Sequence, residues 1–234
     1  MDKFTQFNPL DAAAVGFLVL GWVWIGWRIE HPGSSRPSVS QLMARYRREW
    51  MVEMLTRQPR IFDSSILATL RQGTSFFASA CMIAIGGGLA LMGNTERLTG
   101  VAADLALEQA PAVVWELKIL LVILLLANAF LKFVWSHRLF GYCAVIMASV
   151  PNDADDPVAR PRAAQAGEIN ITAARSFNRG LRAVYFAMGA LAWLLGPAPL
   201  VIATCATVLI LWRREFASHS RSVVMQAADD PARG

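Results

Sequence analysis

The stretch WLLGPAPLV, residues 193–201, decides how many times this chain crosses a membrane. It lies inside an apolar run over residues 181–212, which is too long for one ordinary span and short for two. Either one kinked span covers residues 183–212, or two spans meet at a turn. Gly and Pro are favoured turn residues, so the sequence predicts a turn within residues 196–199.

The composition is that of an integral membrane protein. Of the 234 residues, 55% are hydrophobic and only 17% are charged, which is below the usual share in soluble domains. The apolar residues occur in long blocks, as membrane spans require. The formal net charge of +5 does not indicate nucleic-acid binding, because the basic residues lie beside these blocks, where membrane proteins carry Lys and Arg.

The distribution of charge around the apolar blocks predicts the topology. Eight Arg lie in residues 28–71, six in residues 136–182 and four after residue 212. The other side carries only Lys3, Arg97 and Lys118. Short loops rich in Lys and Arg stay in the cytoplasm, and only a chain that turns at residues 196–199 keeps the C-terminal Arg there. We therefore expect a multi-pass protein of the bacterial inner (plasma) membrane, with its N-terminus outside and its C-terminus cytoplasmic.

The expected fold is all-α: a polytopic helical membrane bundle of about five transmembrane helices plus an amphipathic cytoplasmic helix. One integral-membrane domain is expected over residues 1–220, followed by a disordered cytoplasmic tail over residues 221–234. The last two spans have 13 and 15 residues, so a full crossing and a shallow hairpin both stay open. The predicted spans cover residues 10–29, 74–92, 113–135, 183–195 and 198–212, and the amphipathic helix covers residues 38–57.

Two local patterns refine this arrangement. Ser38 followed by Gln41 resembles a capping box, and apolar residues then recur every fourth position up to Met54. This pattern predicts a helix that lies at the membrane surface or on the bundle. The triplet GGG at residues 86–88 allows another backbone to approach closely, or marks an unwound segment.

The third predicted span carries a polar stripe. Lys118, Asn128 and Lys132 share one helix face by their spacing. Charge within a span is costly unless it pairs, faces water or reaches the surface, so this face is expected to line the bundle or a wet cavity. An ion or proton path and an anionic-ligand site are the functional alternatives. Otherwise, Asn128 bonds another helix while the lysines extend to opposite surfaces.

A second set of polar residues gathers at the predicted cytoplasmic face. Such cations attract anionic lipid headgroups, and a phosphate-bearing ligand is the sharper hypothesis. The positive-inside rule by itself accounts for cations at this face as well. The predicted anion or lipid site comprises Arg71, Arg138, Asn178, Arg179 and Arg182, with His137 and Asn170 beside them.

The sequence predicts no cofactor, no metal and no catalytic residue. Cys81, Cys143 and Cys205 are widely spaced and form no CxxC pair. The three His lie at predicted membrane edges, away from a second ligand. Neither GxSxG, HExxH nor a P-loop occurs, which favours a protein that is not an enzyme without excluding one.

Three stretches resemble an uncharacterised family of bacterial and plant membrane proteins, known only as a domain of unknown function. They are RQGTSFFAS (71–79), KFVWSHRLFGY (132–142) and NITAARSFNRGLRAVYFAMGALAWLLGP (170–197). The resemblance covers about residues 10–220 and implies a multi-span helical protein, with about four spans in the usual description. It implies no activity, cofactor or catalytic residue.

Three functions therefore stay open. The first is a channel- or transporter-like oligomer whose polar stripe faces a cavity. The second is an accessory or assembly protein that binds lipid or partner membrane helices. The third is a membrane enzyme that acts on a phosphate-bearing lipid. The expected partners are the lipid bilayer with its anionic headgroups, further copies of the chain or other membrane proteins, and no nucleic acid.

Overall fold

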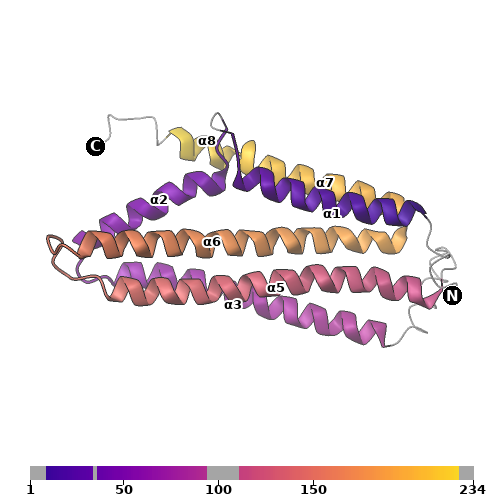
Figure 1. Ribbon diagram of the computed structural model, residues 1–234, viewed down its shortest axis with the longest axis horizontal. Helices are drawn as coiled ribbons and strands as arrows, with labels where there is room; N and C mark the ends of the chain where they lie inside the picture. Colours follow the sequence, from indigo (N-terminus) through magenta and orange to yellow (C-terminus); the bar gives the residue numbers. More distant parts are fainter. Residues whose placement is uncertain (1–8, 34–35, 94–110, 227–234) are drawn as a thin grey trace.

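The computed structural model describes residues 9–33, 36–93 and 111–226. These residues form helices and contain no strand (Figure 1), which confirms the all-α class. In chain order the elements are α1 (Pro9–Glu30), α2 (Val39–Glu53), the 3-10 helix η1 (Met54–Thr56), α3 (Ile61–Met92), α5 (Ala112–Ala148), α6 (Ala159–Ala190), the 3-10 helix η2 (Leu191–Leu195), α7 (Pro197–Phe216) and α8 (His219–Gln226).

The antiparallel helices α5 and α6 form the centre of an elongated molecule (Figure 1). α3 lies along α5, α1 and α7 lie side by side over one end of α6, and α2 crosses the other end at an angle. This arrangement divides the molecule into two halves. The apolar half comprises residues 9–30, 74–93, 111–135 and 180–212, and the polar half comprises residues 31–33, 36–73, 136–179 and 213–226.

The chain reverses direction at Gly196, as the turn residues predict. Gly196 has φ 120°, a backbone conformation that side-chain-bearing residues rarely adopt. Pro197 occupies the first turn of α7, where its fixed φ suits a helix start. Both prolines of the GPAP stretch therefore belong to α7, and the reversal itself needs only the glycine.

Three described helices are long and apolar enough to cross a membrane: α1, α3 and α5. α5 has 37 residues, or about 55 Å at 1.5 Å per residue, and exceeds a hydrocarbon core of roughly 30 Å. It continues through residues 136–148, beyond the span predicted to end at residue 135. α3 likewise begins at Ile61, ahead of the span predicted from residue 74. The count of five spans is not established by these helices.

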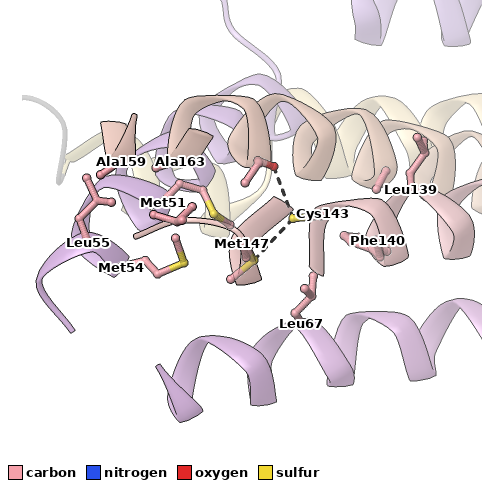
Figure 2. Close-up of a cluster of buried hydrophobic side chains, with 13 residues drawn as sticks. Met51, Met54, Leu55, Leu67, Leu139, Phe140, Cys143, Met147, Ala159 and Ala163 are labelled. Carbon is pink, nitrogen blue, oxygen red and sulfur yellow. Dashed lines mark hydrogen bonds between the residues drawn. The ribbon is translucent and has the colours of Figure 1, made fainter. Parts of the chain in front are cut away.

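The polar half has a core like that of a soluble helical bundle (Figure 2). Met51, Met54 and Leu67 pack against Phe140 and Met147, so α2, η1, α3 and α5 all contribute. Small residues of α6 complete this core at Ala159, Ala163 and Ala166. Helix α2 therefore packs on the bundle, one of the two placements that its amphipathic pattern predicts.

Hydrogen bonds close the helix ends in this half. The Ser38 side chain accepts from the Gln41 backbone N–H, which confirms the predicted cap. Beyond the end of α5, Arg60 donates to the carbonyls of Val150 and Pro151 at 2.8 and 2.7 Å. A cation at a helix C-terminus satisfies free carbonyls and favours the helix dipole.

Close contact at glycines shapes the apolar half. α3 continues through residues 86–88 as regular helix, which excludes the unwound alternative, and only Gly88 of the three lies against α5, beside Ile123. At Gly180 of α6, an added Cβ would lie 2.8 Å from the Phe133 ring, so this glycine lets α5 and α6 approach. Phe133 is fully buried.

The C-terminal region differs in part from the expected disorder. Helix α8 covers residues 219–226, so the beginning of the predicted tail is helical. The Arg221 side chain donates to the Pro37 carbonyl at 3.0 Å and holds α8 near the start of α2. The rest of the tail, Lys3 and Arg97 lie outside the described residues.

Candidate functional site

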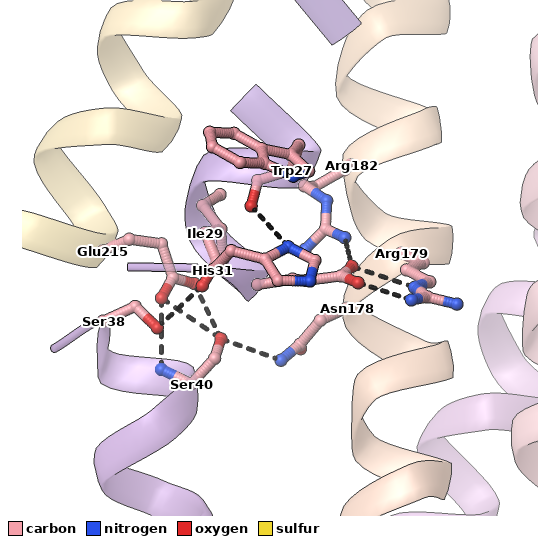
Figure 3. Close-up of polar contacts among 10 residues, drawn as sticks. Trp27, Ile29, His31, Ser38, Ser40, Asn178, Arg179, Arg182 and Glu215 are labelled. Carbon is pink, nitrogen blue, oxygen red and sulfur yellow. Dashed lines mark hydrogen bonds and ion pairs between the residues drawn. The ribbon is translucent and has the colours of Figure 1, made fainter. Parts of the chain in front are cut away.

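The junction of the two halves holds a carboxylate shared by two arginines. Glu30, the last residue of α1, accepts hydrogen bonds from Arg179 Nε at 2.9 Å and from Arg182 Nη2. The Arg182 side chain is only 8% exposed, whereas that of Arg179 is 44% exposed (Figure 3). One carboxylate thus serves one buried and one accessible guanidinium.

The local structure of α1 and α6 explains this meeting. Arg179 and Arg182 are three residues apart and share one face of α6. Gly26 of α1 lies beside that face, and an added Cβ there would be 3.8 Å from Arg182 Nε, an ordinary contact distance. Near the end of α1, Trp24 stacks on Trp212 of α7 with ring centroids 5.8 Å apart.

Burial and pairing shift the pKa values of the two arginines in opposite directions. The hydrogen bond to Glu30 raises the pKa of Arg179. Burial lowers the pKa of Arg182, and Glu30 opposes that effect. Arginine stays protonated over the whole biological pH range, so both groups remain fixed positive charges.

A cavity of about 230 Å³, which we call the interface cavity, opens beside these residues. It unites Asn128 and Lys132, predicted as an intramembrane site, with Arg179 and Arg182, predicted as a cytoplasmic site. Neither the Asn128 nor the Lys132 side chain makes a hydrogen bond within the described part of the chain. The cavity is lined by Trp22, Val23, Gly26, Trp27, Glu30, Asn128, Lys132, Arg179 and Arg182.

A second polar network ties α2 to the other helices (Figure 3). Glu215 of α7 accepts from the Ser40 backbone N–H and from its hydroxyl, all at 3.1 Å. Asn178 donates to the same hydroxyl at 3.4 Å. Ser38 donates to the Ile29 carbonyl at 3.0 Å, next to Glu30. This network fixes the start of α2 beside Glu30, Arg179 and Arg182, which we call the Glu30 cluster.

A larger cavity of about 480 Å³ lies between α2, α3 and α6, and we call it the wedge cavity. It shares Glu30 and Arg182 with the interface cavity and also receives Asn178. Its further charged residues are Arg47, Arg175, Arg214 and Glu215, and its apolar walls include Met43, Leu70, Phe140, Ile171 and Phe177.

The structure separates Lys118 from the rest of the predicted stripe. Lys118 is 6% exposed, and its Nζ lies 5.1 and 5.9 Å from the ring centroids of Trp115 and Trp193. Trp193 in turn donates to Asp11 at 2.6 Å. This group lies at the end of the bundle opposite the polar half, and Lys118 does not line the interface cavity.

Arg71 and Arg138 also lie apart from the interface cavity. Arg71 Nη2 is 3.4 Å from His137 Nε2, and His137 Nδ1 lies 3.2 Å from the Thr74 hydroxyl. Arg138 is exposed and donates to the Tyr142 hydroxyl at 2.9 Å. The predicted cytoplasmic site is therefore three separate groups, of which only Asn178, Arg179 and Arg182 lie together.

Glu30 and Arg47 are the important residues that the sequence did not single out. Glu30 is the one acidic residue between Asp11 and Glu49, within a strongly basic stretch, and that isolation is the signal that marks it. Nothing local marks Arg47, because its partner Asn170 is 123 residues away. Within the described ranges, no three His, Cys, Asp or Glu side chains cluster to hold a metal ion.

Comparison with known proteins places almost the whole chain in one family. The sequence model of the family described as "Protein of unknown function, DUF599" matches residues 13–220. No curated protein and no solved structure matches the chain.

Proposed function

The chain belongs to the DUF599 family of proteins of unknown function, and we propose that it is a multi-pass membrane protein that binds the headgroup of an anionic lipid. The proposed site is the interface cavity. The observation that carries the proposal is that Lys132, Arg179 and Arg182 line this cavity together with a single carboxylate, Glu30. Three cations face one carboxylate here, and a phosphate group supplies the further negative charge and the further acceptor oxygens that would balance them.

The position of the cavity favours a lipid over a free anion. Trp22 and Trp27 line it, and Trp27 is 59% exposed, as expected for a side chain in the interfacial aromatic belt. The cavity lies between α1 and α5 over α6, where lipid reaches it from the side. Lys and Arg near a membrane surface attract anionic lipids, each with about 1 kcal/mol.

The proposal includes the topology predicted from charge. We place the N-terminus outside and the C-terminus in the cytoplasm of a bacterial inner membrane, with α6 and α7 crossing as a hairpin that turns at Gly196. α7 has 20 residues and reaches about 30 Å, but its apolar part ends at Trp212 and covers about 24 Å, so a full crossing requires Arg213 and Arg214 to extend toward the membrane surface. Arg213 and Arg214 in its last turn then lie on the cytoplasmic side.

Retention of lipid in nanodiscs tests the binding site. Protein purified from nanodiscs of mixed phosphatidylcholine and phosphatidylglycerol is released into native mass spectrometry, and the lipid that stays bound is identified. We expect Lys132→Gln and Arg179→Gln to reduce bound phosphatidylglycerol about 10-fold each, as loss of a charge-assisted hydrogen bond predicts. Arg138→Gln is the matched control, because Arg138 is exposed and lies outside the cavity.

Two results count against this proposal. If all variants retain both lipids equally, the interface cavity does not select an anionic headgroup. If millimolar inorganic phosphate displaces phosphatidylglycerol completely, the cavity is a site for free anions.

Cysteine labelling tests the topology. A Cys introduced at Ala198, in a background without native Cys, is expected to react with a membrane-impermeant maleimide added to intact cells. A Cys at His219 is expected to react only after the cells are opened. Labelling of position 198 from the cytoplasm alone contradicts the hairpin.

A transporter-like oligomer is the second candidate, and one observation favours it. The wedge cavity and the interface cavity share Glu30 and Arg182, so two polar cavities adjoin this ion pair. Anion efflux from proteoliposomes tests the idea: Asn128→Leu is expected to stop efflux while the protein still folds. Absence of efflux from the unmodified protein rejects this candidate and leaves lipid binding intact.

A further inference from the structure

The wedge cavity combines apolar walls with an excess of positive charge. Leu70, Phe140 and Ile171 form an apolar surface on one side. Arg47 and Arg175 reach the cavity from α2 and α6. Cavities of several hundred Å³ with apolar walls and a few polar groups are typical of small-ligand sites. The volume of about 480 Å³ is within that range.

Arg47 is a half-buried cation whose partner is neutral. Its Nη1 donates to Asn170 Oδ1, and Asn170 is fully buried and donates to Cys143 Sγ at 3.6 Å. Within the described ranges, no carboxylate lies within ion-pair distance of Arg47. Burial lowers the pKa of Arg47, which reflects the cost of removing its charge from water. An anion in the cavity offsets that cost.

The carboxylates that line the cavity are already engaged elsewhere. Glu30 accepts from Arg179 and Arg182, and Glu215 accepts from Ser40. Among the described residues, the other cavity arginines, Arg175 and Arg214, have no carboxylate within ion-pair distance either. The cavity therefore presents three arginines that no carboxylate of the described structure neutralises.

We infer that the wedge cavity is a second binding site, which takes a ligand with one anionic phosphate or carboxylate group joined to an apolar chain. The anionic group binds Arg47, and the apolar chain packs against Leu70, Phe140 and Ile171. Arg175 is a second cation that lines the same cavity. This inference does not depend on the lipid site proposed above, because Lys132 and Asn128 do not line the wedge cavity. Lipid and soluble amphiphile share this chemistry.

Hexyl phosphate is a suitable probe, since it carries one anionic group on a short chain and dissolves in water. The protein in phosphatidylcholine nanodiscs is titrated with hexyl phosphate, inorganic phosphate or hexanol by calorimetry, with empty nanodiscs as the blank. We expect saturable binding of hexyl phosphate and at least about 10-fold weaker binding of the other two, because each lacks one of the two contacts.

Variants assign the binding to Arg47. Arg47→Gln is expected to weaken hexyl phosphate binding about 10-fold or more. Arg45→Gln, two residues away on the exposed side of α2, is expected to leave it unchanged. If Arg47→Gln does not fold, Arg175→Gln serves in its place, because Arg175 is exposed and makes no hydrogen bond within the described residues. Lys132→Gln is expected to remove only binding at the interface cavity and to leave the Arg47-dependent binding unchanged, which separates the two sites.

The outcome also identifies the source of the ligand. Competition by phosphatidylglycerol in the nanodisc supports a lipid occupant of the site, and lack of competition supports a soluble amphiphile. Equal affinity for inorganic and hexyl phosphate overturns the amphiphile site, as does binding that neither Arg47→Gln nor Arg175→Gln weakens.

Discussion

Both halves of the molecule bury apolar side chains, and they differ in the side chains that they expose. In the polar half, Met51 and Met54 are buried with 1% and 0% exposure, while the charges of Arg48 and Glu168 lie at the surface. In the apolar half, Lys118 is buried at 6% exposure, while Ile83 is 76% exposed. The same chain is thus built like a soluble bundle at one end and with apolar side chains outward at the other.

The surrounding medium explains this difference. Water drives apolar side chains into a core, so the polar half folds around its methionines. Lipid tails are as apolar as leucine, so apolar side chains gain little by leaving lipid, and polar groups become the ones that need partners. The Glu30 cluster lies where the two regimes meet, which explains why it combines a buried ion pair with an exposed one.

Removal of the carboxylate at this junction is expected to have the largest effect. Glu30→Gln removes the hydrogen-bonded counter-charge of the buried Arg182 and leaves only the more distant carboxylate of Glu215. Breaking a buried pair costs about 3–5 kcal/mol. The free energy of unfolding in detergent measures the loss. Glu49→Gln, in the exposed pair with Arg45, is the control and is expected to cost less than about 0.5 kcal/mol. If both variants lose the same free energy of unfolding, the ion pair at the junction of the two halves contributes no more than an exposed pair.

A charge on two equally exposed aliphatic positions tests the difference in medium. Ile83 is 76% exposed in the apolar half and Val145 is 70% exposed in the polar half. Ile83→Arg is expected to cost about 2.5–3.5 kcal/mol of membrane insertion, and Val145→Arg almost nothing. A glycosylation-based insertion assay measures both. If arginine at position 145 has a similar cost of membrane insertion, the polar half also lies in the membrane and the two halves do not differ in their surroundings.

A methyl group at two glycines tests the close packing of α6 on α5 in the apolar half. Gly180→Ala forces a Cβ to within 2.8 Å of the Phe133 ring and is expected to cost about 1–3 kcal/mol of unfolding free energy. Gly141→Ala, which meets nothing within 4 Å, is expected to stabilise helix α5 by up to about 1 kcal/mol. Thermal unfolding followed by circular dichroism distinguishes the two. Destabilisation at both positions argues against the tight contact.

The exposed pair of Arg48 and Glu168 is expected to give the smallest effect. Their side chains are 57% and 59% exposed, and the hydrogen bond to Glu168 raises the pKa of Arg48. Arg48→Gln is expected to cost less than about 1 kcal/mol, and the loss is expected to shrink in high salt. Unfolding at two salt concentrations measures it. A larger loss of unfolding free energy that does not depend on salt would show that the polar half is not surrounded by water.

Several correct predictions about the fold rest on local sequence patterns. The Ser38 cap and the reversal near Gly196 each depend on a few neighbouring residues, and both agree with the structure. The prediction of separate intramembrane and cytoplasmic sites did not anticipate one cavity. Lys132 and Arg179 are 47 positions apart, and only the packing of α5 on α6 brings them together.

The sequence by itself determined the helical class, the apolar helices and the reversal, because apolar blocks, capping residues and a glycine act over one or two helical turns. Only the tertiary structure decided which charges meet. It paired Glu30 with Arg182, gave Arg47 the distant Asn170 and separated Lys118 from Asn128. Helix spacing describes the face of one helix, whereas a charged site needs faces from several helices at a fixed depth and angle.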